Sequence, residues 1–195
     1  MSVPDDDFDP EYDTVEEDFH VTPLISLPAL SPTPAVYPGC CVALSPLLLS
    51  NLSTILPSSS SLILSIGSGT GFLEALLRSE PHDINIIGVE VHPSINRYLQ
   101  TNHHRVVAGS YSLEPLAIEA ETWLFIYPRR VGLVQSYIST YGQGVINQIV
   151  WIGPTADWED YKQCFEVHWD LKVQSAGELG GRGWELVAVA SKKPA

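Results

Sequence analysis

The segment of residues 62–77 constrains the fold more than any other part of the chain. An apolar run of strand length, residues 62–66, leads into three alternate glycines, Gly67, Gly69 and Gly71, and then into a helical pattern. A loop without side chains at the end of a buried strand leaves the first N–H groups of the following helix accessible to a ligand. The segment therefore predicts a strand–turn–helix unit with a binding site at the turn.

Strand and helix patterns alternate along the rest of the chain. Further strands are expected at residues 84–91, 105–108, 122–127, 145–152, 165–174 and 184–191, and helices at residues 46–56, 71–79, 93–100, 131–141 and after the cap at Thr155. Such alternation is typical of a parallel sheet covered on both faces. The predicted fold class is α/β, with a doubly wound, mostly parallel seven-stranded sheet, an antiparallel terminal hairpin and helices on both faces.

The last two predicted strands differ in pattern. Residues 165–174 carry apolar side chains at the odd positions only, which predicts a strand with one buried face. Residues 184–191 are apolar on both faces, so this strand should lie inside the sheet. The glycine-rich turn between them predicts a hairpin.

Three regions of different composition precede or form the domain. Residues 1–20 hold nine carboxylates between Asp5 and Asp18, and we expect a disordered tail or, as the alternative, a docking arm for a protein partner. Residues 21–45 are rich in proline and predict an extended strap that covers the ligand site, anchored near Tyr37. Residues 46–195 form the predicted domain.

The composition restricts the kinds of partner and the cellular compartment that we expect for this protein. The net charge is −13, and no basic stripe is present that could replace the counterions of a nucleic acid. No apolar run reaches the roughly 18 residues that span a bilayer, and the acidic N-terminus does not resemble a signal peptide. Three cysteines form no metal spacing and no disulfide framework. We expect a cytoplasmic protein without a membrane or nucleic-acid partner, with a nuclear location left open.

The glycine pattern separates two classes of ligand. The dinucleotide fingerprint requires a glycine where this chain has Phe72, so a nicotinamide-dependent oxidoreductase is nearly excluded. The pattern Gly67-x-Gly69-x-Gly71, the acidic Glu90 at the end of the second strand and the terminal hairpin together resemble the class I (Rossmann-like) S-adenosylmethionine-dependent methyltransferases. The resemblance covers residues 45–193.

The resemblance implies a set of residues that bind the cofactor S-adenosylmethionine. Those at the methionine end would be Gly67, Ser68, Gly69 and Gly71, while Glu90 would hold the ribose, Val91 would pack on the adenine and Ser110 would lie near its edge. Two positions depart from the family pattern. Ser65 stands at the position, two residues before the first glycine, where the family usually has Asp or Glu. Gly109-Ser110 stands after the third strand, where the family commonly has an acidic residue. Both departures should lower the affinity for the cofactor.

The methyl group of such a cofactor would face the end of the fourth strand. The family often carries Asn or Asp there, followed by prolines and an aromatic residue, whereas this chain has Tyr127, Pro128, Arg129 and Arg130. Tyr127 is therefore the candidate for the substrate-facing residue, the alternative being a tyrosine that only packs at the strand end. Arg129 lies at a helix start, where the dipole disfavours cations, and this suggests an anionic partner in the substrate or in the acidic tail. No metal site is expected.

Two functions follow from these residues. The first is a methyltransferase that uses S-adenosylmethionine and acts on an unassigned acceptor, a small molecule or peptide being favoured over nucleic acid. The second is an inactive methyltransferase-like protein that serves as an interaction module, which Ser65 and the unusual sequence at Tyr127 would favour. The acceptor and the atom that is methylated are not encoded in any motif of the chain.

Overall fold

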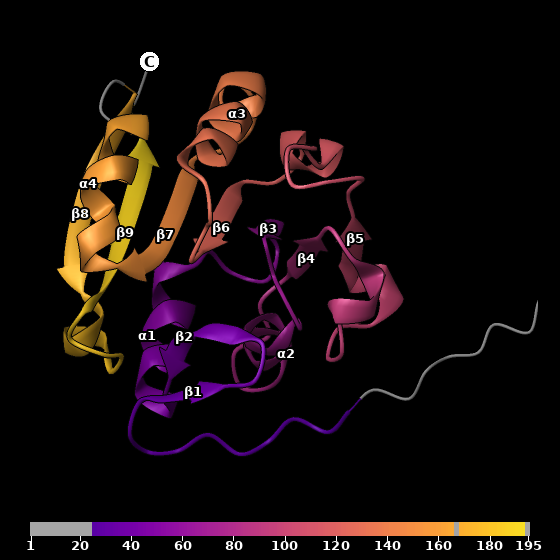
Figure 1. The fold of residues 1–195 in the computed structure, drawn as a ribbon, viewed down its shortest axis with the longest axis vertical. Helices are drawn as coiled ribbons and strands as arrows, with labels where there is room; N and C mark the ends of the chain where they lie inside the picture. The colour runs from indigo at the N-terminus through magenta and orange to yellow at the C-terminus, as the bar shows by residue number, and fades with distance from the viewer. Residues whose placement is uncertain (1–24, 166–167, 194–195) are drawn as a thin grey trace, which may run out of the picture.

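The computed structural model describes residues 25–165 and 168–193; the predicted acidic tail, residues 1–20, lies outside them. A seven-stranded sheet in the order β5-β4-β3-β6-β7-β9-β8 forms the centre of the molecule, and a two-stranded sheet, β1-β2, lies beside it (Figure 1). The strands are β1 (Ala35–Tyr37), β2 (Cys40–Leu44), β3 (Ile63–Ile66), β4 (Ile86–Glu90), β5 (His104–Val106), β6 (Thr122–Ile126), β7 (Gln148–Pro154), β8 (Trp169–Ser175) and β9 (Glu185–Lys192).

The predicted topology of the large sheet is confirmed. Strands β5, β4, β3, β6 and β7 run parallel, whereas β9 pairs antiparallel with both β7 and β8. The strand order reverses between β3 and β6, and in sheets of this kind ligands bind outside the carboxyl ends of the strands at that point. The glycine turn and Tyr127 follow β3 and β6, so both lie at this edge.

Helices cover both faces of the sheet. They are α1 (Pro46–Ile55), α2 (Phe72–Arg78), α3 (Val131–Tyr141) and α4 (Trp158–Tyr161), with short 3-10 turns in the remaining connections. In Figure 1, α1 and α2 lie on one side of the sheet and α3 and α4 on the other. None of the helices in the described ranges is long and apolar enough to cross a membrane.

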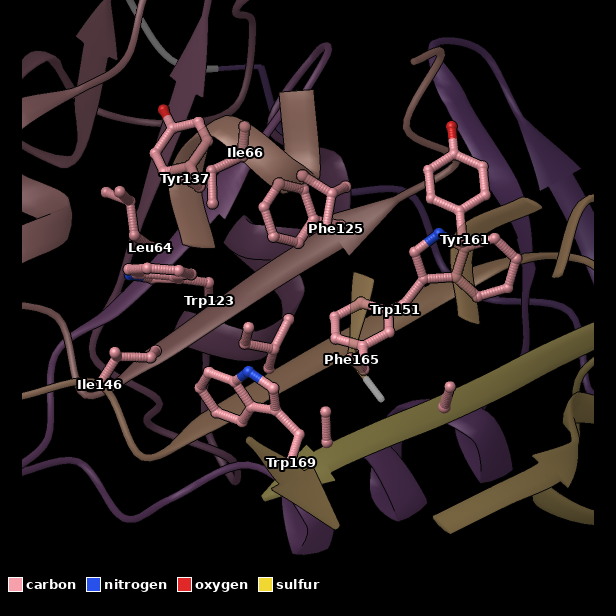
Figure 2. Close-up of a cluster of buried hydrophobic side chains, with 14 of the residues drawn as sticks. Leu64, Ile66, Trp123, Phe125, Tyr137, Ile146, Trp151, Tyr161, Phe165 and Trp169 are labelled. Carbon is pink, nitrogen blue, oxygen red and sulfur yellow. The ribbon is translucent and has the colours of Figure 1, made fainter. Parts of the chain in front are cut away.

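Side chains that alternate along each strand supply two hydrophobic cores. On the side of α3 and α4, Trp123 and Phe125 of β6 pack with Tyr137, Trp151 and other aromatic residues (Figure 2). On the side of α1 and α2, Leu124 of β6 packs against the leucines of both helices. Burial of each large apolar side chain stabilises the fold by about 1.5–3 kcal/mol. Because a slip of one residue would move the side chains of a strand to the opposite face, the period-two pattern determines which core each residue joins.

The proline-rich strap is not extended throughout, because residues 35–44 form the hairpin β1-β2. Val42 and Leu44 of β2 are fully buried in the core that contains α1 and α2. The ring of Tyr37 lies 5.1 Å from the ring of Phe72, the first residue of α2. The second half of the strap therefore packs against the segment that follows the glycine turn.

The prediction of a helix at residues 93–100 is wrong. Only a 3-10 turn, Pro93–Ile95, forms there. The backbone N–H groups of Arg97 and Tyr98 donate to the carbonyl of Thr70 at 3.0 and 3.2 Å, and the Asn96 side chain bonds both backbone groups of Leu99. Hydrogen bonds to the glycine turn thus replace those of a helix.

The strand expected at residues 165–174 begins only at Trp169, and its apolar face is buried at Trp169 but not beyond it. Leu171 and Val173 are 39% and 42% exposed. Strand β8 is at the edge of the sheet, and the partners of Leu171 and Val173 on β9 are the small residues Ala190 and Ala188. The alternating pattern therefore predicted the strand correctly, and its buried face correctly at Trp169 but not at Leu171 and Val173.

The helix expected to begin at the Thr155 cap begins later, at Trp158, after a 3-10 turn. The hydroxyl of Thr155 donates to the carbonyl of Trp184 at 3.0 Å and does not cap the helix. The end of β7 is thereby tied to the start of β9.

Candidate functional site

The glycine turn adopts a conformation that few other residues would tolerate. Gly67, Gly69 and Gly71 have φ angles of +82°, +57° and +74°. A side chain at Gly71 would clash with Leu99, and one at Gly69 would approach the carbonyl oxygen of Gly39 to 2.8 Å. At Gly67, in contrast, no atom lies within 4 Å of the position of a Cβ. The first glycine thus leaves open space beside the backbone, while the other two permit close packing.

Glu90 holds the glycine turn from the neighbouring strand. One carboxylate oxygen accepts a hydrogen bond from the N–H of Gly69 at 3.1 Å, and the other accepts from the N–H of Val91 at 2.7 Å. Each carboxylate oxygen has a second lone pair, so these bonds leave two acceptor positions available. The carboxylate is half-buried, and it therefore remains accessible to a ligand.

The other predicted cofactor-binding residues occupy different environments. Ser68 is buried, and its hydroxyl donates to the carbonyl of Val89 at 3.4 Å. Val91 is half-buried directly after Glu90. Ser110 is exposed on the loop after β5, and in the described part of the chain no hydrogen bond connects it to the glycine turn or to Glu90. Hydrogen bonds therefore connect the glycine turn with Glu90 and with the end of its strand, whereas the role of Ser110 stays a prediction.

A second carboxylate, which the sequence reasoning missed, lies beside Ser65. Glu74, in the first turn of α2, is buried, and one of its oxygens accepts a hydrogen bond from the Ser65 hydroxyl at 2.6 Å. The other oxygen, Oε2, is buried without a hydrogen-bond partner among the described residues. Burial raises the pKa of Glu74 to about 7. A carboxylate from the helix thus reaches the strand position where the family usually has an acid.

The hairpin β1-β2 closes over the glycine turn. The Thr70 hydroxyl donates to the carbonyl of Gly39 at 3.4 Å. The carbonyl of Gly39 also faces Gly69. The hairpin of the strap therefore contacts the glycine turn, and its role as a cover of the ligand site stays a prediction.

Tyr127, the predicted substrate-facing residue, uses its hydroxyl for an internal contact. The hydroxyl donates to Oε1 of Glu185 at 2.7 Å, and burial together with this bond raises the pKa of Tyr127 well above its usual range. The backbone of Tyr127 has a φ of +48°, which costs energy for a residue with a side chain. The proton of the Tyr127 hydroxyl is therefore engaged, and what the side chain can offer a substrate is its ring and the acceptor lone pairs of the hydroxyl.

Glu185, at the start of β9, was not singled out by the sequence reasoning. Its side chain is buried and accepts hydrogen bonds from the N–H of Ala43 at 3.1 Å and from the N–H of Arg182 at 3.2 Å, in addition to the bond from Tyr127. This carboxylate joins the hairpin to the ends of β6 and β9. Its only sequence signal was a charged residue at the start of an otherwise apolar strand.

A cleft opens at the carboxyl end of β6. Its volume is about 410 Å³, and its lining residues are Cys41, Tyr127, Pro128, Arg129, Val131, Asp157, Asp160 and Tyr161. Clefts that bind small molecules have volumes of about 300–1,000 Å³. The cleft therefore has the size of a small-molecule site and lies on the strand next to the glycine turn.

The side chains of the adjacent residues Arg129 and Arg130 lie in different environments. Arg129 lines the cleft, whereas the guanidinium of Arg130 lies 4.2 Å from the centre of the exposed Tyr111 ring. Within the ranges that the structure describes, Arg129 forms no ion pair with a carboxylate. No group of three or more His, Cys, Asp or Glu side chains with metal-binding geometry occurs in those ranges either. Arg129 thus contributes to the cleft a positive charge that has no direct ion-pair partner among the described residues.

The sequence matches no protein-family model and no curated protein. The fold, however, is similar to those of many solved methyltransferases. Precorrin-6Y C5,15-methyltransferase from Geobacter metallireducens has a TM-score of 0.55 and 12% identity over 75% of this chain and 86% of that chain. The methyltransferase domain of a bacterial Hen1 protein has a TM-score of 0.56 and 12% identity over 75% and 97%.

A third similar structure is the tRNA (m1A58) methyltransferase TrmI from Aquifex aeolicus, with a TM-score of 0.55 and 12% identity over 78% of this chain and 70% of that chain. Two of these proteins are named for different substrates, a precorrin and a tRNA, and all three have 12% identity to this chain. The chain therefore has the Rossmann-like fold of the class I S-adenosylmethionine-dependent methyltransferases.

Proposed function

We propose that the protein is an S-adenosylmethionine-dependent methyltransferase that acts on a small acceptor. The observation that carries the proposal is the position of Glu90, whose carboxylate holds the glycine turn and keeps two lone-pair positions for hydroxyl groups. The cleft at Tyr127 lies on the adjacent strand, since β3 and β6 pair in parallel with Ile66 opposite Phe125. A cofactor at the turn would thus have its acceptor site beside it.

The residues around the turn fit this cofactor. The open space at Gly67 admits a ligand against the backbone, and the free acceptor positions of Glu90 suit the two hydroxyls of a ribose. The unpartnered Oε2 of Glu74 suits a positively charged group such as the ammonium of a methionine moiety. A nicotinamide dinucleotide is disfavoured because Phe72 stands at the third glycine position of its fingerprint.

The cofactor would supply a methyl group on a positively charged sulfur, ready for attack by a lone pair. The chain's own contribution would be to orient the acceptor and to exclude water from it. Tyr127 and Tyr161 are fixed on the cleft wall by hydrogen bonds to Glu185 and to the carbonyl of Pro128. Alignment and exclusion of water can supply most of the rate enhancement when the attacking atom is already neutral.

Isothermal titration calorimetry with S-adenosylmethionine, S-adenosylhomocysteine and NAD tests the proposal. We expect the first two to bind and NAD not to bind. Absence of binding by all three would contradict the proposal and would favour the alternative of an interaction module. Preferential binding of NAD would contradict the proposal and would support a nicotinamide-dependent oxidoreductase instead.

Substitution of Glu90 tests the site itself. Glu90→Ala should weaken S-adenosylhomocysteine binding by roughly 1.5–3 kcal/mol, or about tenfold to a hundredfold, since hydrogen bonds to a charged group are lost. Glu90→Gln keeps an acceptor and should lose less affinity. The control is Glu119→Ala, an exposed carboxylate just before β6 at the opposite edge of the sheet, which should not change the affinity. Equal affinities for all variants would place the cofactor elsewhere.

A further inference from the structure

We infer that the acceptor is a small zwitterion, a molecule with an apolar body that carries one ammonium and one carboxylate. This inference rests on the proposed function, because it concerns the cleft that the cofactor site would adjoin. Three properties of the cleft indicate this class of acceptor. The cleft has an apolar wall, carries positive and negative side chains that are not in ion pairs within the described ranges, and lies beside the glycine turn.

The wall of the cleft is apolar and fixed in position. Tyr127, Pro128, Val131 and Tyr161 contribute it. The ring of Tyr161 packs 5.3 Å from that of Trp151, and its hydroxyl donates to the carbonyl of Pro128. Because these contacts hold the ring against the aromatic core, the wall presents a preformed surface for an apolar group.

Charges of both signs line the same cleft. Arg129 comes from the segment before α3, while Asp157 and Asp160 come from the turn and helix after β7. None of the three forms an ion pair within 4 Å in the part of the chain that the structure describes. The neighbouring Lys162, in contrast, is paired with Glu159 at 2.6 Å. The cleft therefore offers one cation and two carboxylates that do not neutralise each other directly.

This arrangement favours some acceptors over others. A carboxylate on the acceptor can pair with the Arg129 guanidinium, and an ammonium can pair with Asp157 or Asp160. A nucleic acid or a phosphorylated acceptor would bring several negative charges next to the two aspartates, which is unfavourable. Arg129, Asp157 and Asp160 are exposed and therefore solvated without a ligand, and a purely apolar acceptor would gain no contact with any of the three charges. A zwitterion is the class that satisfies both signs.

The test uses three probes that share a phenyl ring on a two-carbon chain, and the full-length protein with S-adenosylhomocysteine present. L-Phenylalanine carries both charges, phenethylamine lacks the carboxylate, and 3-phenylpropionate lacks the ammonium. Their dissociation constants are measured by ligand-observed NMR titration. We expect phenylalanine to bind about fivefold or more tightly than either analogue, the size of effect that charge-assisted hydrogen bonds at a partly exposed site produce.

Two charge variants make the assignment specific. Arg129→Gln should reduce phenylalanine binding to the level of phenethylamine and leave phenethylamine binding unchanged. The double variant Asp157→Asn/Asp160→Asn should reduce the affinity for phenylalanine to that for 3-phenylpropionate and should leave the affinity for 3-phenylpropionate unchanged. The controls are Arg97→Gln and Asp170→Asn, which remove exposed charges that do not line the cleft. Circular dichroism establishes that each variant is folded.

The outcomes separate this inference from the proposed function. Equal binding of the three probes, or binding that ignores the charge variants, would overturn the zwitterion inference even when S-adenosylhomocysteine binds normally. Zwitterion binding with the expected variant pattern, but without any binding of S-adenosylhomocysteine, would support the assignment of the cleft and contradict the proposed methyl transfer.

Discussion

At the scale of single residues, Glu185 connects three segments of the chain at one buried carboxylate. Its hydrogen bonds come from Tyr127 after β6, from Ala43 in β2 and from Arg182 before β9. A buried carboxylate with several donors is stable only while the donors remain, because each lost bond leaves a desolvated polar group. The position of Tyr127 in the cleft therefore depends on a residue far away in the sequence.

The hydrogen bond between Tyr127 and Glu185 can be measured with a double-mutant cycle. Tyr127→Phe should lower the free energy of unfolding by about 1–3 kcal/mol, since it leaves one carboxylate oxygen with fewer donors. The same substitution in a Glu185→Ala background should cost much less. Urea unfolding of the four proteins gives the coupling energy. Tyr141→Phe is the control, and additive effects of Tyr127→Phe and Glu185→Ala would contradict the contact.

Glu74 makes stability depend on pH in a direction opposite to that of a typical surface carboxylate. Its pKa is raised from 4.5 to about 7 in the folded chain, chiefly by burial. The folded state therefore holds a proton that the unfolded state releases between these pH values. The resulting stabilisation is fully present below pH 4.5 and is lost as the pH rises through about 7.

We expect Glu74→Gln to remove this dependence. Relative to the variant, the wild-type chain should lose up to about 3 kcal/mol of stability between pH 5 and pH 8, from 1.36 kcal/mol for each unit of pKa shift. Urea unfolding of both proteins at the two pH values gives the difference. Parallel stability curves for the two proteins would show that Glu74 does not titrate in this range.

At the scale of elements, the turn of the hairpin β1-β2 and the glycine turn are packed backbone to backbone. Gly39 has a φ of +76°, and a side chain there would overlap the methyl group of Thr70. Gly67 has a similar φ of +82° but faces open space. The two glycines therefore share a left-handed backbone conformation, which strains any residue with a side chain, and differ in what surrounds them.

Alanine substitutions at these glycines separate packing from ligand binding. Gly39→Ala should lower stability by about 2–4 kcal/mol, because strain and overlap with Thr70 add. Gly67→Ala should cost only about 1–2 kcal/mol of strain, yet it should block S-adenosylhomocysteine by filling the open space. Thermal unfolding and calorimetry measure the two effects. Normal ligand binding by Gly67→Ala would show that the ligand does not lie against this turn.

At the scale of the whole molecule, the strap and the parallel sheet share one hydrophobic core. Val42 and Leu44 are fully buried beside the leucines of α1, and the N–H of Ala43 bonds Glu185. A truncation that removes residues 1–44 would therefore expose the core as well as the site. Its effect on turnover could not be separated from its effect on folding.

Two chains that both lack residues 1–24 isolate the contribution of the strap. The chain of residues 25–195 should unfold cooperatively, whereas the chain of residues 45–195 should lose several kcal/mol, since each buried Val or Leu contributes about 1.5–3 kcal/mol. Circular dichroism during thermal unfolding compares them. Similar midpoints for the two chains would mean that the hairpin is dispensable for the core.

Much of the fold was determined by the sequence alone. The order of strands and helices follows from local periodicity, and the glycine turn follows from three residues whose backbone freedom is intrinsic. The position of Glu90 after its strand was equally local, so its place beside the turn followed from parallel pairing of β3 and β4. These features depend on residues close together in the chain.

Only the tertiary structure decided how distant residues meet. Glu185 bonds Ala43, 142 positions earlier, and Tyr127, 58 positions earlier, and no periodic pattern encodes such pairs. The same holds for Glu74 beside Ser65 and for the exposure of Leu171 and Val173 at the edge strand β8. Sequence periodicity fixes which face of an element is apolar. The partners on that face, and hence the charges that line the cleft, are fixed by packing between elements that the chain brings together only on folding.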